Sequence, residues 1–106
     1  MTFETPNNIT DQAVPFLRRV QRDWQVAETE KTASLGRKFE IIRAYYEVFP
    51  TSLVQEVERR MRTLGTNAKF WHQEFKNAQL ANMNGDTFLN LVAMAILLRD
   101  HKTLIR

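Results

Sequence analysis

The chain has no cysteine, three glycines and three prolines. Without cysteine it can form neither a disulfide framework nor a thiolate metal site. β-Sandwiches and barrels need many turns, which glycine and proline usually build, so their scarcity argues against both classes. No long segment alternates apolar and polar residues with a period of two. The sequence therefore favours an all-α fold.

Long apolar runs are also missing. The longest, Leu91 to Leu98, is far shorter than the roughly 20 residues that cross a bilayer as a helix. The opening segment, MTFETPNNITD, has neither the basic start nor the apolar centre of a secretory signal peptide. We therefore expect a cytoplasmic protein with no membrane partner.

Residue sets that carry catalysis or bind metals are absent as well. The two histidines, His72 and His101, lie on different predicted helices and belong to no group with ligand spacing. Ser34 and Ser52 stand at predicted helix starts, where capping accounts for them. The sequence therefore predicts a protein that is not an enzyme, with no catalytic residues, no metal site and no cofactor.

What the chain does contain is enough apolar residues for one core, 43% of 106 residues. We predict an extended N-terminal lead-in over residues 1–10 and a single helical-bundle domain over residues 11–106. Apolar residues recur every three or four positions, which predicts a compact bundle of about five helices. The last helix is apolar almost all round and should lie at the centre, with Asn90 needing a polar partner there.

The expected helix boundaries follow from capping residues and prolines. Pro15 places the start of the first helix near residues 12–14, and a polar turn follows over residues 28–34. The second helix ends before Pro50, and Thr51 or Ser52 caps the third. The third ends at Gly65, the fourth begins at Thr66 or Asn67, and Asp86 caps the fifth.

Basic residues gather on several of these helices. Fifteen Lys and Arg stand against twelve Asp and Glu, and arginine outnumbers lysine. The planar arginine side chain matches phosphate geometry, which makes phosphate contact the leading interpretation. Arg18 and Arg22 share a helix face about 6 Å apart along the axis, roughly the spacing of successive phosphates in a single strand. The candidate nucleic-acid-binding residues are Arg18, Arg19, Arg22, Arg37, Lys38, Arg59, Arg62 and Lys69.

The arginines of the third predicted helix and the aromatic residues have a structural alternative. Glu56 with Arg60, and Glu58 with Arg62, have the i, i+4 spacing of helix-stabilising pairs. The aromatic residues on apolar stripes suit the core better than base stacking: Trp24, Tyr46, Trp71 and Phe75. Tyr45 lies off the stripe and could be an exposed stacking platform. A helix-turn-helix can also be drawn from Val54 to Phe75.

The stretches AVPFLRRVQRDW and NGDTFLNLVAMAILLRDHKTL, within a small basic helical chain, resemble the small subunit of CRISPR effector complexes. The resemblance implies a non-catalytic subunit that assembles in several copies along a guide-RNA complex. It also implies that basic residues of this chain contact the target or displaced strand, with that role falling on Arg18, Arg22, Arg37, Lys38 and Arg59.

Three hypotheses remain at this point. The first is a sequence-independent nucleic-acid-binding scaffold within a ribonucleoprotein, with nucleic acid and other protein subunits as partners. The second is a helical protein–protein adaptor or inhibitor of phage or plasmid type, whose arginines bind an acidic partner. The third is a helix-turn-helix DNA-binding regulator.

Overall fold

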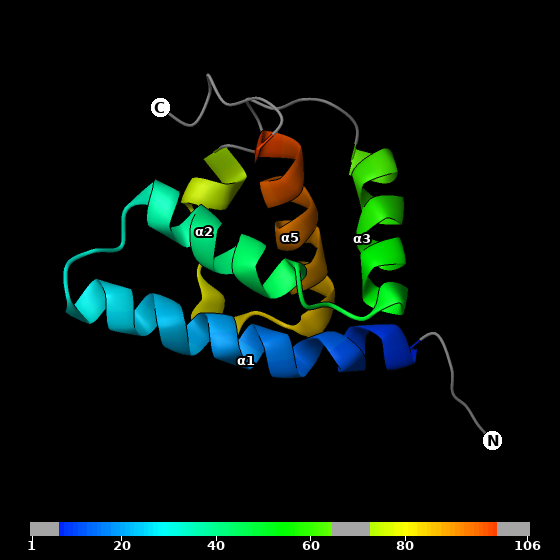
Figure 1. The fold of residues 1–106 in the computed structure, drawn as a ribbon, viewed down its shortest axis with the longest axis horizontal. Coiled ribbons are helices and arrows are strands. Elements are labelled where there is room, and N and C mark those ends of the chain that lie inside the picture. The colour runs from blue at the N-terminus through cyan, green and yellow to red at the C-terminus, as the bar shows by residue number, and fades with distance from the viewer. Residues whose placement is uncertain (1–6, 65–72, 100–106) are drawn as a thin grey trace.

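The computed structural model describes residues 7–64 and 73–99, and every regular element in this part of the chain is helical. The elements, in chain order, are α1 (Asn7–Thr29), α2 (Leu35–Tyr46), α3 (Thr51–Leu64), a helical turn over residues 73–76, the short 3-10 helix η1 (Leu80–Asn82) and α5 (Gly85–Arg99). The predicted all-α bundle is thereby confirmed. Figure 1 shows α1 along one edge, with the other helices on one side of it.

Helix α1 begins earlier than its proline suggests. It starts at Asn7 and carries Pro15 well inside it, so the prediction of an extended segment up to residue 10 is wrong for residues 7–10. Proline has no N–H, which leaves the Asp11 carbonyl without its helical donor. Both Asp11 and Pro15 are exposed, so water can satisfy that carbonyl and the helix continues past the proline.

The turn between α1 and α2 falls where its polar residues predict it. Lys31 adopts a left-handed conformation with φ of 59°. The amide of Lys31 then donates to the Glu28 carbonyl, and the amide of Thr32 donates to the Ala27 carbonyl. These two bonds form the usual left-handed cap of a helix C-terminus, with lysine where glycine is preferred.

Both ends of α2 also agree with the sequence. The Ser34 hydroxyl accepts a hydrogen bond from the Arg37 amide at 3.1 Å, so the predicted serine cap is confirmed. Helix α2 ends at Tyr46, ahead of Pro50.

The start of α3 differs from the prediction. The amides of Leu53 and Val54 donate to the Pro50 carbonyl, so Thr51 and Ser52 lie inside the helix and neither precedes it as a cap. The Ser52 hydroxyl instead donates to Gln12 Oε1 at 3.1 Å. The serine therefore ties α3 to α1 and does not cap the helix.

The predicted boundary at Gly65 and the start of the fourth helix lie outside the described residues, as does most of the predicted helix-turn-helix. Helix α5 is capped two residues earlier than expected. Asn84 Oδ1 accepts from the Thr87 amide at 2.8 Å, which makes Asn84 the cap and places Asp86 in the first turn. The cap prediction for Asp86 is wrong, because its neighbour two residues earlier reaches the free amide first.

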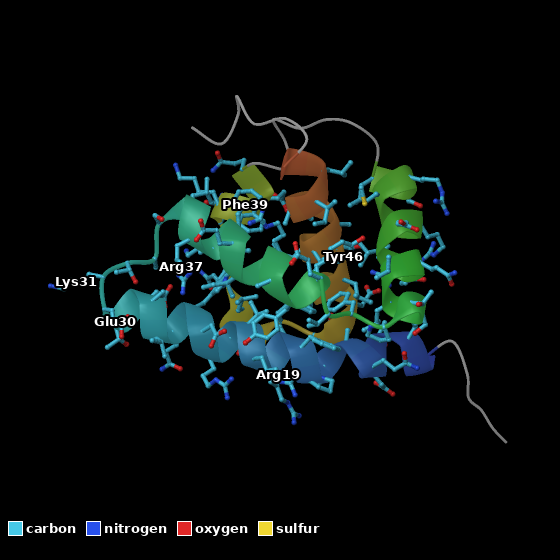
Figure 2. The ribbon with its side chains drawn as sticks, viewed as in Figure 1. Arg19, Glu30, Lys31, Arg37, Phe39 and Tyr46 are labelled. Carbon is cyan, nitrogen blue, oxygen red and sulfur yellow. The ribbon has the colours of Figure 1, made fainter. Side chains whose placement is uncertain are left out.

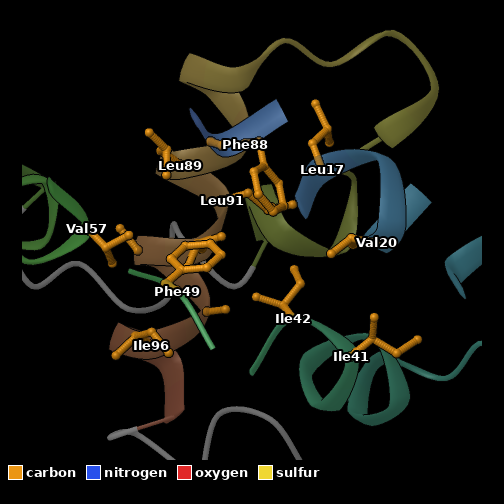
Figure 3. Packing of buried hydrophobic residues seen from close by; sticks show 14 of the residues in the cluster. Leu17, Val20, Ile41, Ile42, Phe49, Val57, Phe88, Leu89, Leu91 and Ile96 are labelled. Carbon is orange, nitrogen blue, oxygen red and sulfur yellow. The ribbon is translucent and has the colours of Figure 1, made fainter. Parts of the chain in front are cut away.

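The core forms around α5. This helix packs against α1, α2 and α3, and the prediction that it occupies the centre is confirmed. Figure 3 shows Phe88, Leu89 and Leu91 of α5 beside Leu17 of α1 and Val57 of α3. Burial all round explains why α5 is apolar on every side.

Helix α5 approaches α1 most closely at Gly85. A Cβ atom at this position would collide with the Thr10 carbonyl oxygen and lie 3.4 Å from Val14 Cγ2. Only glycine allows the two backbones to meet at this distance. The contact fixes where α1 lies on the bundle.

Candidate nucleic-acid interface

Three of the predicted site residues lie together on the outer face of α1. Arg18, Arg19 and Arg22 are exposed, and we call these three side chains the arginine ridge. The opposite face of the helix is buried in the core through Ala13, Leu17, Val20, Trp24 and Ala27. This apolar stripe turns the arginines outward at the molecule's edge, where Figure 2 shows Arg19 pointing away from the other helices.

The arginines of the ridge have few partners within the protein. Arg22 is 69% exposed and lies 3.8 Å from Asp23 Oδ1, a long ion pair. The Arg19 guanidinium lies 5.8 Å from the centre of the Phe16 ring. Arg18 borders a groove of about 450 Å³ that also includes Asp11 and Asp86, yet among the described residues it forms no hydrogen bond or ion pair. Their donors are therefore open to an external anion.

Two carboxylates near the ridge also have partners outside it. Asp23 Oδ2 accepts a hydrogen bond from the Tyr45 hydroxyl at 2.6 Å. Asp86 Oδ1 lies 2.8 Å from Arg60 Nη2. Arg60 balances the charge of Asp86, whereas the tyrosine hydroxyl is neutral and leaves Asp23 negatively charged beside Arg22.

Tyr45 joins α2 to α1 and is not an exposed stacking platform, so that prediction is wrong. Its ring is half-buried against the core, and its hydroxyl is held by Asp23. The hydrogen bond to Asp23 raises the pKa of Tyr45, burial adds to the rise, and Arg22 opposes it. A tyrosine with its hydroxyl engaged in this way cannot leave to stack on a base.

Arg37 and Lys38 follow the Ser34 cap at the start of α2. Arg37 Nη1 lies 3.6 Å from Glu40 Oε1. Lys38 is half-buried, with Nζ 5.1 Å from the centre of the Trp24 ring. Figure 2 shows Arg37 near the loop end of the α1–α2 hairpin, while Arg19 lies at the outer edge of α1. This pair is thus partly engaged within the protein and separate from the arginine ridge.

On α3 the predicted residues have different surroundings. Arg59 is 58% exposed, but its guanidinium makes two hydrogen bonds to the Glu56 carboxylate. These bonds lower the pKa of Glu56, against the opposing effect of burial, with Arg60 adding to the decrease. Arg62 is exposed in the last turn of the helix and forms no ion pair with Glu58 within the described residues, so the predicted Glu58–Arg62 pair is wrong. Lys69, the remaining predicted residue, lies outside the described residues.

Arg60 is the basic residue whose role sequence reasoning missed. It is 8% exposed and bonds to Glu56 Oε2 at 2.8 Å, the Asp86 carbonyl at 2.9 Å and Asn90 Oδ1 at 3.0 Å. The Glu56–Arg60 pair was predicted, and so was a partner for Asn90; both are confirmed. The missed signal was that Arg60 shares the apolar stripe of Leu53 and Val57 at helical spacing.

The described residues contain neither a metal-ligand cluster nor a membrane-spanning helix. They contain no group of three or more histidine, aspartate or glutamate side chains that could hold a metal ion. None of the described helices combines the length and the apolar character needed to cross a bilayer.

Comparisons with protein-family models, with curated proteins and with solved structures find no match to this chain. The case for a functional site therefore depends on the geometry of the arginine ridge and on the charges around it.

Proposed function

We propose that this chain is a non-catalytic subunit that binds nucleic acid through phosphate contacts of the arginine ridge, without sequence preference. The observation that carries the proposal is the state of the three ridge arginines. They are exposed on one face of α1, and among the described residues their one ion pair is the 3.8 Å contact of Arg22 with Asp23. Arginines in this state are suited to oxyanions, since each guanidinium offers several donors in a fixed fork.

Lack of sequence preference follows from the same face. Pro15 and Val26, which flank the arginines on this face, offer no side-chain hydrogen bond to a base edge, and the other exposed residues there are Asp11, Gln12 and Gln25. Contacts to phosphate position a protein on nucleic acid but carry no direct sequence information. Binding should therefore depend strongly on salt and weakly on sequence.

We further propose a setting, which is the small subunit of an RNA-guided CRISPR effector complex in the cytoplasm. There the chain would help to hold the target or displaced strand beside other copies of itself. This part of the proposal rests on the sequence resemblance and on the compact all-α bundle. An affinity-tagged chain isolated from its host should then bring several proteins and one short guide RNA with it.

Charge reversal tests the binding activity directly. The double variant Arg18→Glu, Arg22→Glu should lose binding to a fluorescently labelled mixed-sequence DNA by at least about 50-fold at 0.1 M salt, since each lost phosphate contact costs roughly eightfold there. Circular dichroism should show unchanged helicity, because both residues are exposed. Unchanged affinity in this variant would contradict the proposal.

The isolation experiment also separates the proposal from a protein adaptor. One half of the sample is treated with nuclease before washing, and both halves are analysed by mass spectrometry and RNA sequencing. A partner that is a single acidic protein, retained equally in both halves, would show that the arginines dock a protein and that nucleic acid is not the ligand.

A further inference from the structure

We infer that the arginine ridge binds a double helix, bridging the two rows of phosphates on either side of one groove. The inference rests on the proposed function and names the class of nucleic acid. It departs from the single strand that the Arg18–Arg22 spacing and the displaced-strand role predict, because the structure adds Arg19 and the shape of the face to that spacing.

The arginines of the ridge spread around α1. Successive residues of an α-helix point about 100° apart, so Arg18 and Arg19 diverge to opposite flanks of the exposed face with Arg22 between them. A single strand following the Arg18–Arg22 line would leave Arg19 without a phosphate. Two rows of phosphates would occupy both flanks.

Helix α1 protrudes little from the bundle. From Asp11 to Val26, the exposed positions of the helix cover a sector of only about 140°, and the remainder is buried or half-buried against the bundle. A helix embedded to this extent cannot enter the major groove deeply. It is also too wide, at roughly 10–12 Å with side chains, for a minor groove of about 6 Å. Lying along the mouth of a groove, with one arginine reaching the phosphates on each side, is the arrangement that this shape allows.

The described part of the chain presents no exposed aromatic surface on which bases could stack. Proteins that hold single strands combine a basic groove with aromatic side chains on which bases stack. Here Trp24 and Phe75 are buried, and Phe16, Tyr45 and Tyr46 are half-buried against the core. Phe16 also lies beneath the Arg19 guanidinium. A single strand would gain little from bases on this surface.

The energetics of phosphate binding also favour a duplex. Without stacking, affinity comes from the counterions released when arginines neutralise phosphates. Each contact changes the logarithm of the affinity by about 0.9 per logarithmic unit of salt on duplex DNA and about 0.7 on a single strand. For equal contacts, the surface therefore gains more from a duplex.

The test compares a labelled 20-base-pair DNA duplex with each of its separated strands by fluorescence anisotropy between 50 and 200 mM salt. For three phosphate contacts, duplex affinity should fall about 40-fold across this range, and the single strands should bind more weakly throughout. Arg18→Gln and Arg19→Gln should each weaken duplex binding by about eightfold at 0.1 M salt. Lys31→Gln, at the end of α1 and outside the arginine ridge, is the charge-matched control and should leave it unchanged.

Each contrary result has a distinct meaning. Single strands that bind as tightly as the duplex, or an Arg19→Gln variant with unchanged duplex affinity, would overturn the inference and leave the proposed function standing. Failure of the wild-type protein to bind either form would overturn both.

Discussion

Helices α1 and α3 carry similar clusters of arginine, but the fold uses them differently. On α1, Arg18, Arg19 and Arg22 face outward and have few partners. On α3, Arg59 is held by Glu56, and Arg60 is buried between Glu56, Asp86 and Asn90. The same residue type therefore forms a candidate binding surface on one helix and part of the framework on the other.

The difference teaches that the position of the carboxylates, more than the number of arginines, decides which cluster is available. Glu56 precedes its two arginines on α3 by three and four residues, a spacing at which side chains meet on a helix. Asp23 adjoins Arg22 in sequence but is held by Tyr45 from α2. Glu56 therefore pairs more closely with the arginines of α3, at 2.8 Å from Arg60, than Asp23 pairs with Arg22 of α1, at 3.8 Å.

The largest effect that separates the two helices should come from Arg60. Replacing it with alanine leaves Glu56 and Asn90 without their buried partner and should lower the free energy of unfolding by about 3 kcal/mol, the low end for a broken buried ion pair, since Asp86 is 63% exposed. Arg62→Ala, on the same helix, should change it by less than about 0.5 kcal/mol. Urea unfolding measures both, and similar values for the two variants would refute the framework role of Arg60.

The next effect concerns how α1 is seated. Gly85→Ala places a methyl group against the Thr10 carbonyl and should destabilise the protein by about 2 kcal/mol, as overpacking does. The matched control is Gly36→Ala in α2, where no atom lies within 4 Å, and it should stabilise by about 0.5–1 kcal/mol. Thermal unfolding of the two variants should shift in opposite directions. Shifts of the same sign would contradict the close approach of α5 to α1.

A smaller effect on stability, limited to acidic pH, should come from Glu56 of α3. The folded pKa of Glu56 is lowered from 4.5, so its contribution to stability is complete above about pH 4.5 and is lost as the pH falls through the lower folded value. Glu56→Gln should therefore flatten the dependence of unfolding free energy on pH between 3 and 6. The exposed neighbour Glu58, changed to glutamine, provides the control and should preserve the wild-type slope.

The smallest effect should lie at the end of α1, beyond the ridge. Lys31→Gly relieves the left-handed backbone and should stabilise the protein by about 0.5 kcal/mol, while Lys31→Ala keeps the Cβ atom and should not. Nucleic-acid affinity should stay close to wild type, because Lys31 lies outside the arginine ridge. Stabilisation by alanine equal to that by glycine would show that the backbone conformation is not the cause.

Much of the fold could be predicted because periodicity and caps are local properties. The apolar stripes, the Ser34 cap and the central position of α5 are examples. The start of α1 could not be predicted, since Pro15 is accommodated by exposure that only the packed bundle defines. The cap of α5 was missed because Asn84 and Asp86 are both good capping residues and backbone geometry selects between them.

The candidate site could be predicted only in part, because it too depends on contacts between helices. Arginine clusters are visible in the sequence, but their partners come from other helices. The Tyr45–Asp23 bond joins residues of α2 and α1, and the Arg60–Asn90 bond joins residues of α3 and α5. Tertiary contacts of this kind decide which charges remain free, and local spacing does not encode them.

The most direct test of the central claim is a comparison of two charge-matched double variants, Arg18→Gln with Arg22→Gln on α1, and Arg59→Gln with Arg62→Gln on α3. The affinity of each for labelled mixed-sequence duplex DNA is measured from 50 to 200 mM salt. We expect the α1 variant to reduce the steepness of the plot of log affinity against log salt by about two units, and the α3 variant to leave it near the wild-type value. Equal reductions in both variants would show that binding follows net charge alone, and would contradict the assignment of the site to α1.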